Sequence, residues 1–258
     1  MRLLLLLGCC FATTLPPALE GVSIHEKLGA QVDGNLSFYN EQGKSVLLRD
    51  VITRPVILVL VYYECPHLCT FVLNGLIEGL KGVQEDVELV VISIDPREAA
   101  AVRAGSDLAQ KKKDSYAVAY GRAHAGWHFF TGEERAVRKL ADAIGFAYRY
   151  DEKDMQYAHG AGLFFLGPSG ILKRFLPGVS FASRDIRLAL AEAAGSGHSS
   201  SLVQQMQLFC YRYDPKARTY SVALMRLMRV AVLVTVGLVG TYLGLFWSGR
   251  RRKGSRWV

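Results

Sequence analysis

The sequence predicts an α/β fold, because strongly apolar segments alternate with helical ones along most of the chain. The segments 56–63, 87–94 and 162–167 have the length and composition of buried strands. Two cysteines, Cys65 and Cys69, follow directly after the first of these strands. A cysteine pair at the first strand–helix junction makes the expected fold a thioredoxin-like mixed sheet flanked by helices.

The remaining elements are expected in the following order. Residues 30–50 alternate weakly in polarity and contain Asp33-Gly34 and Gln42-Gly43, which is typical of an N-terminal β-hairpin ahead of the main strand. Periodicity then predicts helices at about 67–82, 96–113, 133–144 and 183–194, and strands near 147–150 and 171–176.

The N-terminus has the pattern of a short export signal. Arg2 precedes a run of leucines and then small residues, and the expected signal peptide covers residues 1–20, with cleavage near Ala18. The segment Leu6-Leu7-Gly8-Cys9 also resembles a lipoprotein processing site, in which Cys9 would carry the lipid. Both interpretations place the following domain outside the cytoplasm.

The C-terminal region carries a candidate membrane span. The thioredoxin-like domain is expected over residues 21–195, followed by a linker and juxtamembrane segment over 196–229. Residues 230–247 are uncharged and predict a transmembrane helix. The arginine-rich residues 248–258 are expected in the cytoplasm, since positive charge favours that side. The predicted location is therefore the bacterial inner membrane, with a single pass and a periplasmic domain.

The net charge of +8 does not indicate a nucleic-acid-binding protein. Eight basic residues near the two ends account for the whole excess, so basic and acidic residues between them are equal in number. These eight are Arg2, Arg226, Arg229, Arg250, Arg251, Arg252, Lys253 and Arg256. The basicity belongs to the membrane-directed ends, which excludes a nucleic-acid partner from the prediction.

The chemistry is expected at Cys65-Pro66-His67-Leu68-Cys69. A helix N-terminus favours a thiolate over a thiol, and Pro66 suits a first helical turn. Residues at i and i+4 are neighbours on a helix, so both sulfurs can reach one ion or each other. His159 precedes the strand at 162–167, in an expected loop, and is a candidate third ligand. Two thiolates and one imidazole suit copper, Cu(I) especially.

Other polar residues have simpler interpretations. Asp95 either orients a ligand or caps the following helix, and Lys111-Lys112-Lys113 is interpreted as a solvated helix end. Cys210 lies apart from the core motif and is interpreted as an idle thiol as readily as a functional one.

The chain resembles the Sco/SenC family, whose members are membrane-tethered thioredoxin-fold copper proteins of cytochrome c oxidase assembly. The resemblance spans roughly residues 35–190 and rests on five matching segments. They are the hairpin near Asn40–Leu48, Cys65-Pro66-x-x-Cys69, Ser93-Ile94-Asp95-Pro96, Trp127–Gly132, and His159 with Phe164–Gly170. The resemblance implies that Cys65, Cys69 and His159 are copper ligands, for Cu(I) or Cu(II). His67 and Thr70 depart from the family pattern, which commonly has Asp and Pro there.

Two functions are expected from these residues. In the first, a metallochaperone passes copper to an apo-copper-site subunit of cytochrome c oxidase or another copper or thiol protein. In the second, a thiol–disulfide oxidoreductase uses Cys65 and Cys69 to keep a partner's copper-site cysteines reduced, with His159 dispensable. A peroxidase and an inert structural disulfide fit the sequence less well, because the peroxiredoxin setting is absent and so short a loop constrains little chain entropy.

Overall fold

The computed structural model describes residues 21–65, 68–121, 126–195, 211–214, 219–222, 230 and 232–243. The chain divides into two compact units, Met1–Ala193 and Ala194–Val258. The expected signal peptide, Cys9, Pro66, His67, Cys210 and the expected cytoplasmic tail lie outside the described residues.

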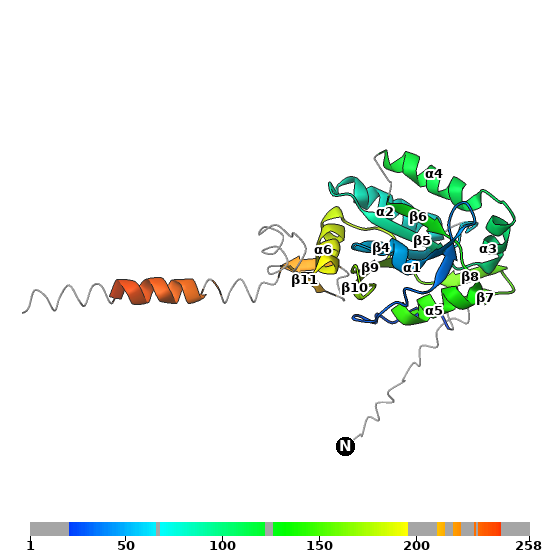
Figure 1. The fold of residues 1–258 in the computed structure, drawn as a ribbon. Helices are drawn as coiled ribbons and strands as arrows, with labels where there is room; N and C mark the ends of the chain where they lie inside the picture. The colour runs from blue at the N-terminus through cyan, green and yellow to red at the C-terminus, as the bar shows by residue number, and fades with distance from the viewer. Residues whose placement is uncertain are drawn as a thin grey trace, which may run out of the picture. The chain divides into compact units, whose positions relative to one another are not determined.

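A five-stranded mixed sheet in the order β10-β9-β4-β5-β6 forms the centre of the first unit (Figure 1). Its strands are β4 (Val56–Val61), β5 (Glu88–Ser93), β6 (Trp127–Phe130), β9 (Gly162–Leu166) and β10 (Leu172–Pro177). Strands β4, β5 and β6 run parallel, whereas β9 pairs antiparallel with both β4 and β10. Every residue of β4, β5 and β9 is buried, as their largely apolar composition predicts.

Two smaller sheets accompany the central one. Strands β2 (Ser37–Tyr39) and β3 (Ser45–Leu47) pair antiparallel and confirm the N-terminal hairpin. A three-stranded sheet joins β1 (Ser23–Ile24), β7 (Phe146–Asp151) and β8 (Gln156–His159), with β7 in the middle. This second sheet carries His159, which was expected in a loop and instead ends strand β8.

The helices of the first unit match the expected positions, except that the short α1 was not expected and the segment 96–113 differs. They are α1 (Leu48–Val51), α2 (Leu68–Lys81), α3 (Pro96–Arg103), α4 (Leu108–Tyr120), α5 (Glu134–Ile144) and α6 (Ser183–Ala194). The single helix expected over 96–113 is wrong, because the chain breaks into α3 and α4. Gly105 takes φ of +97° at the break, a left-handed conformation that glycine adopts without steric cost.

Glycines on α2 allow the chain before α6 to lie directly on this helix. A Cβ atom at Gly75 would lie 1.9 Å from the carbonyl oxygen of Val179, and one at Gly79 would lie 2.6 Å from that of Phe181. These approaches exclude any side chain at the two positions without movement of the backbone. The close contact fixes α2, and therefore Cys69 in its first turn, against the 178–182 segment.

The second unit has two described parts. Strands β11 (Tyr211–Asp214) and β12 (Thr219–Val222) pair antiparallel, and residues 230 and 232–243 are helical. The apolar side chains of that helical part are exposed, including Leu233, Leu238 and Tyr242. Within the described ranges, no helix combines the length and the apolar character that a membrane crossing requires. The expected span over 230–247 extends beyond the described residues.

Candidate metal centre

The two cysteines lie at the carboxyl end of the central strand β4. The chain turns after Val61, and the N–H of Cys65 donates to the carbonyl of Tyr62 at 3.3 Å. The sulfur of Cys65 accepts the N–H of Cys69 at 3.4 Å, and the sulfur of Cys69 accepts the N–H of Tyr62 at 3.4 Å. Each sulfur therefore has one backbone donor, which favours negative charge on it.

His159 faces this pair from the end of β8, where it pairs with Tyr148 of β7. Its Nδ1 lies 2.7 Å from the carbonyl oxygen of Gly160. A carbonyl only accepts, so the Nδ1 nitrogen carries the proton and Nε2 keeps a free lone pair. That Nε2 lies 3.2 Å from the sulfur of Cys69. The histidine is thus held in the tautomer that binds a metal or accepts a thiol proton.

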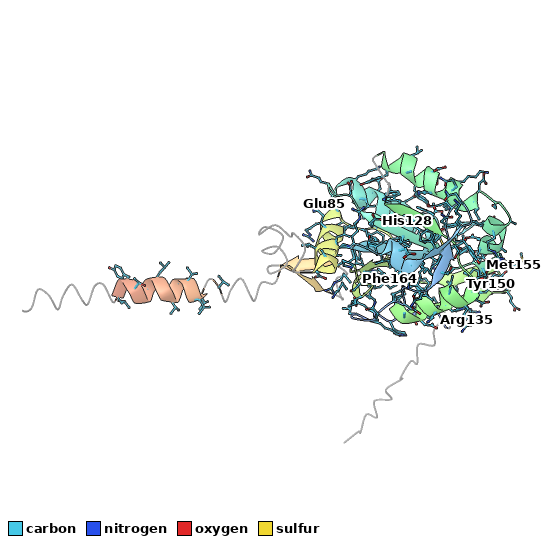
Figure 2. The ribbon with its side chains drawn as sticks, viewed as in Figure 1. Glu85, His128, Arg135, Tyr150, Met155 and Phe164 are labelled. Carbon is cyan, nitrogen blue, oxygen red and sulfur yellow. The ribbon has the colours of Figure 1, made fainter. Side chains whose placement is uncertain are left out.

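The hairpin that carries His159 turns at Met155, which has φ of +50° and an exposed side chain (Figure 2). Tyr150 and Tyr157, on its two strands, lie with ring centroids 5.0 Å apart. Tyr157 in turn contacts Tyr62, whose ring meets the His159 ring edge-on at 5.9 Å. These aromatic contacts fix the imidazole against the β4–α2 junction.

The three predicted ligand side chains form one group. The sulfurs of Cys65 and Cys69 and a ring nitrogen of His159 all lie within 4.8 Å of one another. Two ligand atoms at about 2.3 Å from one ion are at most about 4.6 Å apart, so closure on an ion needs only small side-chain shifts. Cys69 is fully buried and the other two residues are each 8% exposed. Among the three, only Cys65 and His159 retain any solvent exposure.

The two thiols differ in acidity. A hydrogen bond from the Cys69 side chain, and a further one from the Cys69 N–H, hold the pKa of Cys65 well below its usual range against the opposing effect of burial. Burial, and then the hydrogen bond to Cys65, raise the pKa of Cys69. The pair therefore holds one thiolate, at Cys65, and one proton, at Cys69. This donor set of two sulfurs and one imidazole suits a soft ion.

Glu98 is a site residue that sequence reasoning missed. This buried side chain on α3 accepts the N–H of Tyr63 at 3.0 Å and that of Glu64 at 2.8 Å, and it also accepts the Ser93 hydroxyl. Burial raises its pKa. Its position two residues after Pro96, in the first turn of the helix that follows Asp95-Pro96, was the only signal in the sequence. Glu98 fixes the backbone immediately before Cys65.

Two earlier interpretations are resolved by the contacts. Asp95 caps α3, since its carboxylate accepts the N–H of Arg97 at 2.9 Å and pairs with the Arg97 guanidinium at 2.6 Å. The solvated helix end expected at 111–113 is wrong for two of its lysines. Lys112 donates to the carbonyl of Tyr63 at 2.7 Å, and Lys113 pairs with the buried Glu41 at 2.9 Å. Lys111 alone is largely exposed and pairs with Asp107 at 3.0 Å.

Comparison with known families decides the relationship. The model of the SCO1/SenC family matches residues 25–194, which include all three residues of the centre. The chain belongs to the SCO1/SenC family. A comparison with curated protein sequences found no match.

Solved structures of SCO1/SenC proteins share the fold. The SCO1/SenC family lipoprotein from Bacillus anthracis str. Ames is 16% identical, with a TM-score of 0.52 over 67% of this chain and 99% of that one. BsSco, described as a cytochrome c oxidase assembly protein with a disulfide switch, is 22% identical, with a TM-score of 0.51 over 67% and 99%. ScoI of Arabidopsis thaliana, solved with copper bound, is 20% identical, with a TM-score of 0.50 over 62% and 97%.

Proposed function

We propose that this SCO1/SenC protein is a membrane-anchored metallochaperone. It binds copper through Cys65, Cys69 and His159 and delivers it for cytochrome c oxidase assembly. The observation that carries the proposal is the buried contact between Cys69 Sγ and His159 Nε2, with the histidine held in its metal-binding tautomer by Gly160. The copper-bound form of the related Arabidopsis ScoI supports copper as the cargo.

Loading and release follow from the protonation of the pair. Cys65 enters as a thiolate, whereas Cys69 must give up its proton as the ion arrives. One proton therefore leaves for each Cu(I) bound. Release to an acceptor is a ligand exchange, in which the acceptor's thiolate or imidazole replaces the protein's donors one at a time. An incoming donor reaches the ion first beside Cys65 and His159, because Cys69 is fully buried and these two retain some exposure.

The test compares copper binding by a reduced fragment of residues 21–200 with that of the His159→Ala variant. We expect one copper per wild-type fragment. Loss of the imidazole should weaken binding by at least about 100-fold, since even residues behind the ligands contribute 10- to 100-fold in metal sites. The exposed His25→Ala variant is the control and should bind as wild type does. Affinity that is weak throughout, or equal with and without His159, contradicts the proposal.

A second function is favoured by the unequal acidity of the two thiols. The Cys65 thiolate attacks a partner disulfide, forms a mixed disulfide and releases one partner thiolate, which takes up a proton. Cys69 then loses its proton and displaces the second partner thiolate. Cys65 and Cys69 end as a disulfide, and the partner holds two thiols ready for copper. This activity prepares the same acceptor that the metallochaperone loads.

The anchor belongs to the proposal as well. Residues 230–247 form a single span, residues 248–258 lie in the cytoplasm, and the copper domain lies on the periplasmic side of the inner membrane. The apolar, uncharged composition of the span and the arginines after it support this placement.

A further inference from the structure

The peptide group that joins Tyr63 to Glu64 is held at both of its ends by charged side chains. Its carbonyl oxygen, from Tyr63, accepts a hydrogen bond from Lys112 Nζ at 2.7 Å. Its N–H, from Glu64, donates to Oε1 of Glu98 at 2.8 Å. The two side chains come from different helices, Lys112 from α4 and Glu98 from α3. This peptide lies one residue before Cys65.

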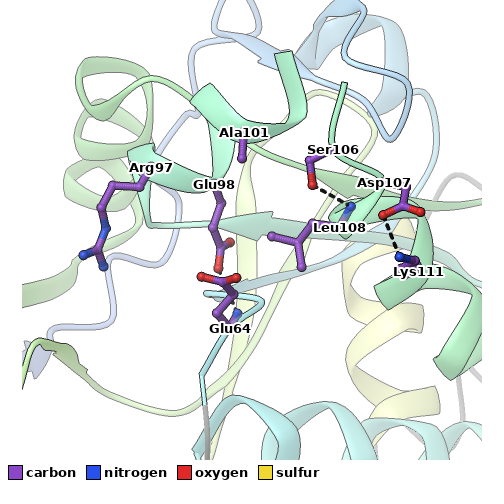
Figure 3. A pocket seen from close by; sticks show the side chains of 8 residues that line it. All are labelled: Glu64, Arg97, Glu98, Ala101, Ser106, Asp107, Leu108 and Lys111. Atoms are coloured by element: carbon purple, nitrogen blue, oxygen red, sulfur yellow. Dashed lines mark hydrogen bonds and ion pairs between the residues drawn. The ribbon is translucent and has the colours of Figure 1, made fainter. Parts of the chain in front are cut away.

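The surroundings of the two side chains show that these contacts are built into the fold. Glu98 is 2% exposed, and Figure 3 shows its side chain extending from α3 toward Glu64. Lys112 is half-buried, whereas the neighbouring Lys111 is largely exposed and pairs with Asp107, as Figure 3 shows. Among three consecutive lysines, only Lys112 contacts the backbone that leads into the cysteine motif.

The arrangement fixes the orientation of the peptide. A trans peptide is planar, and its C=O and N–H point in opposite directions. The positive Lys112 faces the negative end of this dipole, and the Glu98 carboxyl faces the positive end. Hydrogen bonds to charged groups are roughly twice as strong as neutral ones. A rotated peptide would place its carbonyl against the carboxyl and its N–H against the ammonium group, so both contacts would become repulsive.

We propose that Lys112 is a positioning residue of the metal centre. Acting with Glu98 across the Tyr63–Glu64 peptide, it fixes the backbone that places the Cys65 sulfur opposite Cys69 and His159. The inference rests on the proposed function where copper is concerned. Lys112 does not touch the ligand atoms, and its effect passes through one peptide group.

A purely structural role would give a different result from a positioning role. If Lys112 only ties α4 to the β4–α2 junction, its loss lowers the unfolding midpoint and leaves the properties of the site unchanged. If it positions Cys65, its loss changes the site in a protein that remains folded. The experiment therefore needs a measurement on the apo-protein as well as one with copper.

The test uses the full chain and the variants Lys112→Met, Lys112→Arg and Lys111→Met. In the reduced apo-protein, we expect Lys112→Met to accelerate amide hydrogen exchange over residues 62–65 by at least about tenfold, since hydrogen bonds to charged groups are among the stronger ones in proteins. Copper affinity should fall about 10- to 100-fold, and the thiolate-to-Cu(II) charge-transfer band should shift. Lys112→Arg retains the positive charge and the hydrogen-bond donors, so it should recover most of the protection from exchange and most of the copper affinity. Lys111→Met should match wild type in both measurements.

Amide hydrogen exchange in Lys112→Met that is unchanged from wild type overturns the inference, whether or not the copper affinity changes. Faster exchange with wild-type affinity and an unshifted band overturns it too, because the role is then structural. If wild type itself binds no copper, the proposed function fails. The positioning role is then tested by two measurements on the apo-protein: amide hydrogen exchange, and the rate at which oxidised dithiothreitol converts Cys65 and Cys69 to a disulfide. A rate in Lys112→Met equal to that of wild type overturns the positioning role. If Lys112→Met does not fold, Lys112→Gln replaces it in every measurement.

Discussion

At the scale of single residues, the metal centre depends on the different protonation of its two cysteines, with a thiolate at Cys65 and a thiol at Cys69. Cys65 and Cys69 lie in one motif four residues apart, yet their pKa values move in opposite directions. The cause is local: Cys69 is enclosed by protein and donates to its neighbours, whereas the Cys65 sulfur receives donors. A symmetric pair would need two deprotonations to bind Cu(I), but this one needs a single deprotonation.

The different protonation of the two cysteines predicts how the thiolate signal of the protein changes with pH. The pKa of Cys65 is lowered to about 3, so its thiolate persists from neutral to mildly acidic pH and is lost only as the pH falls toward that value. Its contribution to stability has the same sign: it is present at high pH and disappears as the pH falls through the folded-state pKa. The ultraviolet absorbance of the reduced apo-protein should therefore report one thiolate between pH about 5 and 8.

Two variants check the assignment of that thiolate. Cys65→Ser should remove the absorbance at neutral pH. Cys69→Ala should retain it but shift its loss to higher pH, because the strongest donor to Cys65 is gone. A wild-type signal that titrates near the ordinary thiol range would contradict the assignment.

At the scale of elements, the position of Cys69 depends on how tightly α2 packs. Gly75 and Gly79 face the backbone of residues 179 and 181, and the distances leave no room for a methyl group. The part of α2 from Gly75 to Gly79 is therefore held by contact with backbone atoms, which leaves little room for the helix to slide.

The packing of α2 gives a prediction for stability. Gly75→Ala should lower the free energy of unfolding by about 1–3 kcal/mol, because its Cβ must displace the Val179 carbonyl. The matched control is Glu78→Ala on the exposed face of the same helix, where the ion pair with Lys81 contributes little. Denaturant unfolding of both variants measures the difference. Equal stability of Gly75→Ala and Glu78→Ala would show that the 178–182 segment moves to accommodate the added Cβ at little cost in free energy.

The elements also show what sequence patterns reveal. The largely apolar segments of β4, β5 and β9 were sufficient to identify them, since a strand buried on both faces is mostly apolar. Strand β6 was not recognised as a strand, because four residues with a histidine among aromatics carry no periodicity. The break between α3 and α4 was missed because helical residues continue on both sides of Gly105.

The candidate site was predictable only in part, for a similar reason. Cysteine and histidine commonly bind metals, so Cys65, Cys69 and His159 could be picked out from the sequence, and the structure brings them together. Glu98 and Lys112 are ordinary surface residue types whose roles depend on which backbone atoms they meet. Such roles arise from tertiary contacts that spacing along the chain does not encode.

At the scale of the whole molecule, the metal centre and the proposed anchor belong to separate compact units. Removal of residues 223–258 should therefore release the protein from membranes and leave copper affinity unchanged, since all three ligands lie in the first unit. Membrane fractionation of cells that produce the full or the shortened chain measures release. A shortened chain that still sediments with membranes would indicate attachment at the N-terminus, for which a Cys9→Ala variant of the shortened chain is the check.

The division of ligands between two sheets has a mechanical consequence. Both sulfurs follow the central sheet, whereas the imidazole is carried by the three-stranded sheet of β1, β7 and β8. A bound ion is therefore a cross-link between two layers, and cargo that binds only the folded state adds its binding energy to folding. An ion held by all three ligands would therefore oppose separation of the β7–β8 hairpin from the end of β4.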